Sequence, residues 1–294
     1  MSNDELRKEK WMARGMSMAG RVDGRVAFIT GAARGQGRSH AVRLAEEGAD
    51  IIALDACAAI DSASYPMPTS EDLAETVRLV QALDRRIVAG RVDVRDFEAL
   101  KQLVDDGVAE LGRLDIVVAN AGIANPTVVD EISQRAWHDM IDINLTGVWN
   151  TVKVSLRHLR SGGRGGSIVL TSSVAGLEGD VGHAHYIAAK HGVTGLMRAL
   201  ALELAPDRIR VNSLHPTNVN TGMILNDSMM RLFRPDQEHV TIEEFAAAAE
   251  EMQALPIPWV EADDVSNALL FLVSEDGRYI TGVALPVDGG RIAK

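Results

Sequence analysis

A strand, a glycine-rich turn and a helix follow one another near the start of the chain. Residues 25–30 form a short apolar run that is typical of a buried strand, and residues 31–37 (GAARGQG) place three glycines before an amphipathic segment at residues 38–46. Glycine lets the backbone approach a pyrophosphate closely, and the first N–H groups of a helix attract anions. This order of elements predicts a dinucleotide site.

The glycines are spaced Gly31-x-x-x-Gly35-x-Gly37, not in the commoner Gly-x-Gly-x-x-Gly pattern. A glycine-rich turn alone is a weak signal, but here it has a flanking strand and helix and an acid at the end of the next apolar run. That acid is Asp55, which follows residues 49–54. A carboxylate there accepts a hydrogen bond from a ribose 2′-hydroxyl and repels a 2′-phosphate, which favours NAD over NADP. Alternatively, Asp55 is a helix N-cap or a turn acid.

Arg34 in the glycine turn gives the opposite indication, because a guanidinium can bind a 2′-phosphate. We give Asp55 more weight, since an unpaired like charge costs more than a flexible arginine gains. The cofactor-binding candidates in this region are Gly31, Arg34, Gly35, Gln36, Gly37 and Asp55.

Apolar runs alternate with amphipathic segments along the rest of the chain. Further strands are expected at residues 86–92, 114–119, 167–171, 208–214 and 280–287. Helices are expected at residues 97–111, 137–159 and 262–273. Another helix is expected to begin at about residue 70, and the helix that holds Tyr186 and Lys190 is expected to end at about residue 204. No linker or repeat divides the chain. The pattern predicts one doubly wound α/β domain at residues 21–294, preceded by a mobile arm at residues 1–20.

Two connections are too long for simple turns. Residues 56–70 form a mostly uncharged loop, whereas most strand-to-helix connections take about 2–6 residues. This insertion either folds over the adenosine part of a cofactor and slows its release, or is a surface excursion. Residues 217–258 are rich in methionine and other apolar side chains, which suits a lid over an apolar substrate. The same apolar positions could pack the lid on the domain, and both roles can hold together.

Small and polar residues follow several expected strands, at the end that faces the ligand crevice in such sheets. Asp93 is placed to meet an adenine edge, and Asn120-Ala121-Gly122 lets the backbone approach a ribose, although Asn120 could instead tie neighbouring strands together. The other cofactor-binding candidates at strand ends and in the turns beyond them are Val94, Pro216, Thr217, Val219 and Thr221.

Ser173, Tyr186 and Lys190 are the residues expected to carry chemistry. Ser173 closes a strand, and Tyr186 and Lys190 lie four apart in an alanine-rich helical run, so they share one face. A lysine ammonium beside a phenol favours the phenolate and lowers the tyrosine pKa. Moving that pKa from about 10 to about 7 needs roughly 4 kcal/mol, which one cation rarely supplies alone, and an oxidised nicotinamide would add a second charge.

Tyr186-x-x-x-Lys190 taken alone is an ordinary pair on a helix surface. The position of Ser173, thirteen residues before Tyr186, and the glycine motif favour the chemical interpretation.

Asn144 and Gly147 lie inside the expected helix at 137–159, where both residue types are unfavourable. A packing or chemical reason is therefore expected. Asn144 could release a main-chain carbonyl that holds a water beside Lys190, or it could pair with a neighbouring helix. His183 and His185 are expected in a loop near the mouth of the site and not as metal ligands, so no metal site is expected.

Composition narrows the classes of partner. The net charge of −11 argues against a nucleic-acid surface. No apolar run approaches the ~18 residues that cross a bilayer, and the charged first residues do not resemble a signal peptide. Cys57 is the single cysteine, which excludes a disulfide framework within the chain. We expect a soluble, cytoplasmic protein that binds neither nucleic acid nor membrane.

Together, Thr30-Gly31-x-x-x-Gly35-x-Gly37, Asn120-Ala121-Gly122, Asn144, Ser173 and Tyr186-x-x-x-Lys190 resemble the short-chain dehydrogenase/reductases over residues 22–292. The resemblance implies a seven-stranded parallel sheet, a homotetramer and NAD(P)-dependent alcohol–ketone chemistry. It also implies that Tyr186 is the acid/base, Lys190 its activator and a nicotinamide-ribose ligand, Ser173 the anchor of the substrate oxygen, and Asn144 the proton-relay residue.

One motif departs from the family pattern. His215-Pro216-Thr217 stands where the family usually has Pro-Gly, which leaves the nicotinamide-side backbone contacts less defined. Thr221 remains suited to the carboxamide.

Residues 31–40, the 56–70 insertion and residues 71–77 resemble a narrower subgroup, the mycofactocin-associated, carveol-dehydrogenase-like enzymes of actinobacteria. That resemblance implies NAD that stays bound and is reoxidised in place by mycofactocin. We expect interconversion of a hydrophobic secondary alcohol, such as a terpenoid, and its ketone. The alternatives are a dehydrogenase that exchanges NAD freely and an NAD-binding regulatory or scaffold protein without turnover. The intact Ser173, Tyr186 and Lys190 set argues against the last.

Overall fold

The computed structural model describes residues 20–234 and 239–294. The arm expected at residues 1–20 lies outside the described residues, apart from Gly20.

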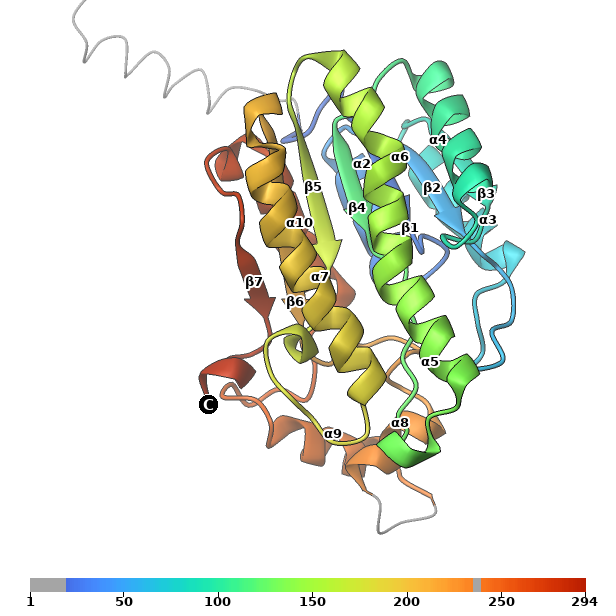
Figure 1. The fold of residues 1–294 in the computed structure, drawn as a ribbon, viewed down its shortest axis with the longest axis vertical. Helices are drawn as coiled ribbons and strands as arrows, with labels where there is room; N and C mark the ends of the chain where they lie inside the picture. The colour runs from blue at the N-terminus through green and yellow to red at the C-terminus, as the bar shows by residue number, and fades with distance from the viewer. Residues whose placement is uncertain (1–19, 235–238) are drawn as a thin grey trace, which may run out of the picture.

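One parallel sheet of seven strands forms the centre of the molecule (Figure 1). The strand order is β3-β2-β1-β4-β5-β6-β7, which confirms the predicted doubly wound, Rossmann-type fold. The strands are β1 (Val26–Thr30), β2 (Asp50–Asp55), β3 (Ile87–Arg91), β4 (Ile116–Ala119), β5 (Gly166–Thr171), β6 (Ile209–Pro216) and β7 (Ala284–Val287). The chain order reverses between β1 and β4, and ligands of such sheets bind in the crevice beyond the carboxyl ends of the strands at this point.

Helices cover both faces of the sheet. The helices of the main body are α2 (Gly35–Glu46), α3 (Ser70–Gln81), α4 (Phe97–Leu111), α5 (Gln134–Ile141), α6 (Gly147–Gly162), α7 (Ala184–Glu203) and α10 (Ala262–Val273). In Figure 1, α4, α6 and α7 lie in front of the sheet, and α2 and α10 pack against each other behind it. Two further helices, α8 (Asp227–Phe233) and α9 (Ile242–Glu250), lie beyond the carboxyl ends of the strands.

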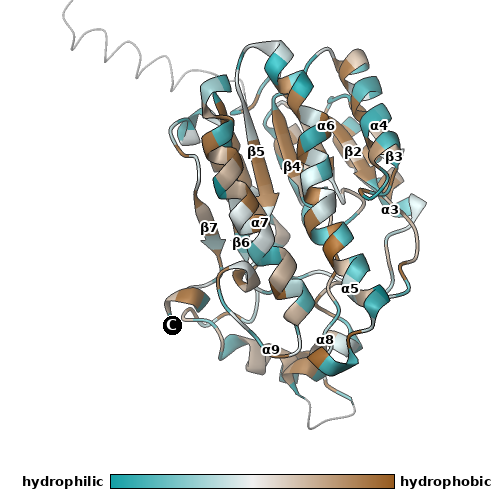
Figure 2. Ribbon diagram, in the orientation of Figure 1, coloured by the Kyte–Doolittle hydropathy of each residue, from teal (hydrophilic) through white to brown (hydrophobic). Residues whose placement is uncertain are grey.

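Alternate strand residues enter two separate cores. Phe28 and Leu54 pack into the core that α4, α6 and α7 close, whereas Ile29 and Ile51 pack into the core under α2 and α10. Because both faces of the sheet are covered, the central strands β1, β2, β4 and β5 are nearly continuous apolar runs, and β2, β4 and β5 stand out as hydrophobic in Figure 2. The apolar runs in the sequence therefore predict the strands well.

The expected helix at 137–159 is interrupted by a π-helical turn, η2 (Asp142–Thr146), between α5 and α6. The Gly147 N–H bonds to the Asp142 carbonyl, five residues back. A Cβ on Gly147 would lie 2.5 Å from Cγ2 of Val94, so glycine is needed there for close packing. This contact supplies the packing reason that the sequence suggested for Gly147.

Two strand boundaries differ from expectation. The last strand was expected at 280–287 but begins at Ala284, because the chain turns at Gly282, which has a φ of +76°. β6 extends two residues further than expected, to Pro216, because His215 and Pro216 pair with β7.

We expect Gly147→Ala to destabilise the protein by about 1–3 kcal/mol, since the added methyl group overlaps Val94 in a packed core. The higher helix propensity of alanine opposes this by only about 1 kcal/mol. Urea unfolding checks the prediction. Gly195→Ala in α7 is the control, because a Cβ there meets no atom within 4 Å. Equal stability of the two variants would contradict this account.

Candidate active site

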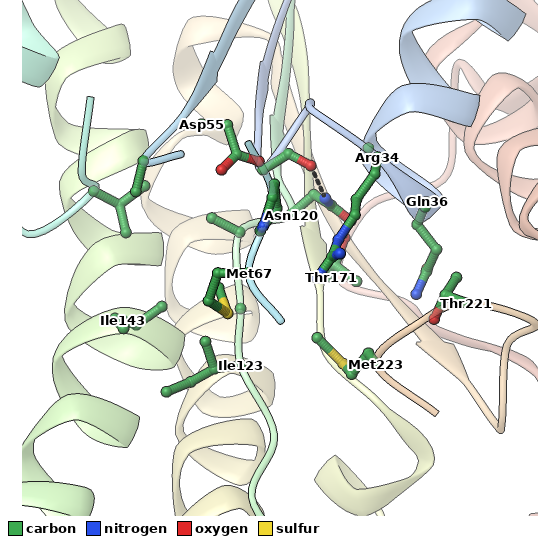
Figure 3. A pocket seen from close by; sticks show the side chains of 18 of the residues that line it. Arg34, Gln36, Asp55, Met67, Asn120, Ile123, Ile143, Thr171, Thr221 and Met223 are labelled. Atoms are coloured by element: carbon green, nitrogen blue, oxygen red, sulfur yellow. Dashed lines mark hydrogen bonds between the residues drawn. The ribbon is translucent and has the colours of Figure 1, made fainter. Parts of the chain in front are cut away.

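A cavity of about 370 Å³ opens at the carboxyl ends of the central strands (Figure 3). The glycine turn, the end of β2, the insertion, the residues after β4 and helix α7 all line it. A cavity of this size is within the range of small-ligand sites.

The glycine turn forms one wall of the cavity. Gly31 and Gly35 have φ values of +68° and +54°, which favour glycine. A Cβ on Gly37 would overlap the Gly31 carbonyl oxygen, and a Cβ on Gly31 would lie 2.9 Å from Cα of Ala121. Arg34 is the N-cap of α2 but makes no side-chain cap bond. The first N–H groups of α2 therefore border the cavity without a capping side chain, as a phosphate site requires.

Asp55 ends β2 at the edge of the cavity. Its carboxylate accepts hydrogen bonds from the N–H groups of Ala33 (3.2 Å) and Cys57 (3.1 Å). Burial raises the pKa of Asp55, and these backbone bonds and the charge of Arg34 oppose that rise. The helix N-cap alternative is wrong, because α3 begins at Ser70 and is capped by Thr69. The Cys57 N–H donates to the carboxylate of the residue two positions before it, which is the pattern of an aspartate that closes a turn. The turn alternative is therefore correct, and Asp55 also lines the cavity.

Arg34 is held by the insertion. Its Nη2 donates a hydrogen bond to the carbonyl of Pro66, and its charge acts on Asp55. The guanidinium therefore has partners within the chain, which weakens its value as an indication of a 2′-phosphate.

The insertion lies against the cavity. Ile60, Tyr65 and Met67 line it, and the buried Tyr65 hydroxyl accepts a hydrogen bond from the N–H of Ala124 (3.4 Å). The length of the insertion was the only sequence signal for these residues, so their individual positions were missed. Residues at other places that also line the cavity and were not predicted include Ile123, Ile143 and Met223.

Two polar contacts fix the far side of the insertion. Ser62 donates to Asp139 on α5 (2.8 Å), and Asp61 forms an ion pair with Arg135 on the same helix (2.7 Å). These contacts hold the insertion against the domain, so it is not a free surface excursion.

The predicted residues at the ends of β3 and β4 all line the cavity. Asp93 is paired with Arg95 (2.7 Å), and although burial raises its pKa, the bonds from Arg95 hold that pKa below its ordinary value. The Asn120 side chain donates to the Thr30 carbonyl (3.0 Å), which ties the end of β4 to the end of β1. The structural alternative for Asn120 is thus correct, although the residue also faces the cavity. Val94, Ala121 and Gly122 lie beside these residues.

Ser173, Tyr186 and Lys190 meet where this cavity adjoins a smaller one of about 100 Å³. The Ser173 hydroxyl lies beside the Tyr186 phenol and lowers its pKa, against the effect of burial. The Lys190 ammonium donates to the Thr171 carbonyl (2.8 Å) and lies 5.5 Å from the centre of the Tyr186 ring. Tyr186 lines both cavities, Lys190 the larger and Ser173 the smaller.

The pKa of Tyr186 does not follow the expectation for a phenol beside an ammonium. Burial raises the pKa of Tyr186, and only the bond from Ser173 opposes it. Burial also lowers the pKa of Lys190 to about 8. The expected lowering by Lys190 is therefore wrong for the protein alone, because burial disfavours both charged forms.

Asn144 is fully buried and lines neither cavity. Its amide makes two hydrogen bonds with the main chain of Ile123, one to the N–H and one to the carbonyl, each of 2.8 Å. Of the two alternatives for Asn144, pairing with a neighbouring helix is wrong, because its main-chain partner lies in the segment after β4. A Cβ on Gly122 would lie 3.3 Å from Oδ1 of Asn144 and 3.7 Å from Nζ of Lys190. Asn144 is thus close to Lys190, with Gly122 beside both.

The smaller cavity takes residues from the segment 217–258. Apolar side chains of Met223, Ile224, Met229, Leu232 and Phe233 line it. Three predicted cofactor residues, Pro216, Thr217 and Val219, line only this smaller cavity. The hydroxyl of Thr217 accepts a hydrogen bond from Gln253 (2.9 Å), so the residue that replaces the family glycine is tied to the chain beyond α9.

Gln36 and Thr221 line both cavities. Thr221 adjoins the glycine turn, since a Cβ on Gly35 would lie 3.2 Å from its Cγ2 (Figure 3). The Oε1 atom of Gln36 is buried without a hydrogen-bond partner in the part of the chain that the structure describes. Buried acceptors are normally satisfied, so this atom suits an N–H donor from a bound ligand.

The two histidines expected in a loop have different surroundings. His183 is the N-cap of α7 and lines the smaller cavity, near the mouth as expected. His185 lies within α7 and is fully buried, so its expected loop position is wrong.

The sequence analysis also missed Arg291, which lines the smaller cavity and pairs with Glu178 (2.5 Å) and Asp180 (3.3 Å).

Within residues 20–234 and 239–294, no three His, Cys, Asp or Glu side chains are grouped as a metal site would need. In the same residues, every helix is too short or too polar to cross a membrane.

Comparisons with known proteins agree with this geometry. A model of the short chain dehydrogenase family matches residues 25–231. A (−)-trans-carveol dehydrogenase of Rhodococcus erythropolis is 60% identical, over 93% of this chain and 99% of its own length. The crystal structure of carveol dehydrogenase from Mycobacterium avium in complex with NAD is 62% identical, with a TM-score of 0.93 over 94% of this chain and 100% of its own. A short chain dehydrogenase from Mycobacterium paratuberculosis bound to NAD is 47% identical, with a TM-score of 0.86 over the same shares.

The fold, the cavity at the strand reversal and these relatives define an NAD-dependent oxidoreductase. The glycine turn, which leaves no room for side chains, and the unpaired Gln36 amide oxygen fit this cofactor. The chain belongs to the short-chain dehydrogenase/reductase family.

Proposed function

We propose that this protein interconverts a hydrophobic secondary alcohol of the terpenoid class, similar to carveol, and the corresponding ketone. The observation that carries the proposal is the meeting of Ser173, Tyr186 and Lys190 at the wall between the dinucleotide cavity and a small cavity lined by apolar side chains. The 60% identity to a (−)-trans-carveol dehydrogenase supports the substrate class.

The cofactor residues take the following roles in this proposal. Asp55 accepts hydrogen bonds from the adenosine ribose, and the turn from Gly31 to Gly37 holds the pyrophosphate at the start of α2. The other residues around the cofactor are Asp93, Val94, Asn120, Ala121, Gly122, Tyr186, Lys190, Pro216, Thr217, Val219 and Thr221, with Lys190 at the nicotinamide ribose and Thr221 at the carboxamide.

Catalysis in this proposal needs one proton acceptor and one anchor. NAD, when bound, supplies the hydride acceptor or donor. Ser173 hydrogen-bonds the substrate oxygen while the Tyr186 phenolate takes the hydroxyl proton. Lys190 keeps a positive charge near the phenol, and a water chain that passes Asn144 carries the proton away.

We expect Tyr186→Phe to lower kcat by about 10²–10⁴-fold while NAD binding is retained, because the phenol oxygen is the proton acceptor. Oxidation of carveol and a wider alcohol panel with a dye acceptor measures the loss. Tyr279→Phe is the control, since Tyr279 is 87% exposed.

Wild-type turnover by Tyr186→Phe would refute the role of Tyr186. A wild-type protein that oxidises no alcohol of the panel would instead support an NAD-binding regulatory protein. The intact serine, tyrosine and lysine cluster favours the enzyme.

We also propose that NAD stays bound and is reoxidised in place by mycofactocin. The contacts that support this fasten the insertion over the cavity from three sides: Arg34 to Pro66, Tyr65 to Ala124, and Ser62 to Asp139. Release of a nucleotide beneath the insertion requires these contacts to open, which slows dissociation.

We expect the purified, desalted protein to carry NAD, detected by its absorbance after denaturation. The double variant Arg34→Ala/Ser62→Ala should exchange labelled NAD at least about fivefold faster, because losing two hydrogen bonds removes about 1–3 kcal/mol from the free energy that holds the insertion closed. Arg157→Ala, on the surface of α6, is the control. An empty wild-type site would favour the dehydrogenase that exchanges NAD freely.

A cytoplasmic homotetramer is the assembly that we propose. Trp137 on α5, Trp149 on α6, Phe271 on α10 and Tyr279 after α10 are all exposed. Two separate apolar faces suit a tetramer with two kinds of twofold interface. Light scattering should give four times the 31.7 kDa chain mass, and a monomer would contradict the proposal.

A further inference from the structure

His215 is a buried histidine that touches the catalytic serine from outside both cavities. It is the next-to-last residue of β6 and is fully buried, and it does not line either cavity. Its Nδ1 lies 2.7 Å from the carbonyl oxygen of Ser173, and its Nε2 lies 2.8 Å from Oγ of Ser213. Both ring nitrogens therefore have partners, and one partner is the main chain of the proposed substrate anchor.

The partners define the tautomer of His215. A carbonyl oxygen only accepts hydrogen bonds, so Nδ1 carries the proton that it donates to Ser173. In a neutral ring Nε2 then accepts the hydroxyl proton of Ser213. Burial lowers the pKa of His215 to about 4, against the effect of the Ser173 bond and with help from the charge of Lys190. The ring is therefore neutral at neutral pH, with Nδ1 protonated.

Ser173 needs such support because it lies just beyond the paired part of its strand. The last ladder bond runs from the Ser172 N–H to the Leu214 carbonyl (2.9 Å). The Ser173 carbonyl then accepts from the Gly176 N–H (2.9 Å) on one side and from His215 on the other. These two donors fix the peptide plane that follows Ser173.

The orientation of this peptide also sets the direction of the hydroxyl. Oγ of Ser173 accepts from the Ala175 N–H (3.2 Å) and lies 3.5 Å from the Pro216 carbonyl. Both partners lie in segments that the His215 contact connects, namely the turn after Ser173 and the end of β6. A shift of about 1 Å in a reacting group can lower a rate by about 100-fold, so a fixed peptide here matters for catalysis.

We propose that His215 is a positioning residue that orients the Ser173 hydroxyl toward Tyr186 and the substrate by holding the Ser173 carbonyl. This inference rests on the proposed function, which makes Ser173 the anchor of the substrate oxygen. It gives a role to the His215-Pro216-Thr217 motif, whose histidine faces the serine while its threonine faces Gln253.

The first test compares two substitutions in NAD-loaded enzyme, with carveol and a dye acceptor, at equal NAD content. His215→Leu fills a similar volume without a donor and should lower kcat at least about tenfold. His215→Asn keeps an N–H near the position of Nδ1 and should retain kcat within about threefold. Equal loss in both variants would overturn the proposal.

A double-mutant cycle separates positioning from general structural damage. In a Ser173→Ala background, adding His215→Leu should cost less than about twofold in kcat, because the group that His215 orients is already absent. The same fold-loss in both backgrounds would overturn the proposal. If Ser173→Ala alone leaves turnover unchanged, the proposed function fails instead.

The ring itself provides a readout that needs no substitution in the active site. ¹⁵N NMR of the holoenzyme at neutral pH should show Nδ1 of His215 protonated and Nε2 unprotonated. The opposite tautomer or a charged ring would overturn the proposal even where His215→Leu fails to fold.

Discussion

The site depends on the close approach of main-chain segments where the strand order reverses. A side chain on Gly37 would overlap the Gly31 carbonyl, and one on Gly31 would press on the Ala121 backbone. The Asn120 amide joins the same ends of β1 and β4. This packing leaves the first turn of α2 open to the cavity, which reaches the end of β5 beside the proposed catalytic residues.

Burial makes the chemistry of this site dependent on its cofactor. The pKa of Tyr186 is raised and that of Lys190 is lowered to about 8, so the protein alone disfavours the charged pair. In the proposed mechanism, the missing positive charge comes with oxidised NAD, which links the activation of Tyr186 to cofactor occupancy. An insertion that holds the cofactor in place would then also keep the phenol active between turnovers.

Three supports from different parts of the chain converge on the proposed catalytic residues. Lys190 is tied to the end of β5 through Thr171, Asn144 is tied to the segment after β4 through Ile123, and Ser173 is tied to β6 through His215. All three bonds use a main-chain group, so they hold backbone positions that side-chain packing alone would leave free to shift.

The sequence by itself determined the sheet and the glycine turn, because central strands buried on both faces are continuous apolar runs and glycine is required where backbones touch. It also named many of the side chains that the structure brings around the two cavities, and their chemical roles stay predictions. It could not show that Asn144 lies in a π turn and bonds Ile123, that His185 is buried, or which insertion residues line the cavity. It also gave the wrong direction for the Tyr186 pKa, since spacing along a helix reveals a neighbouring charge but not desolvation. The tertiary structure decided these points, because hydrogen-bond partners and burial depend on segments that meet only when the chain is folded.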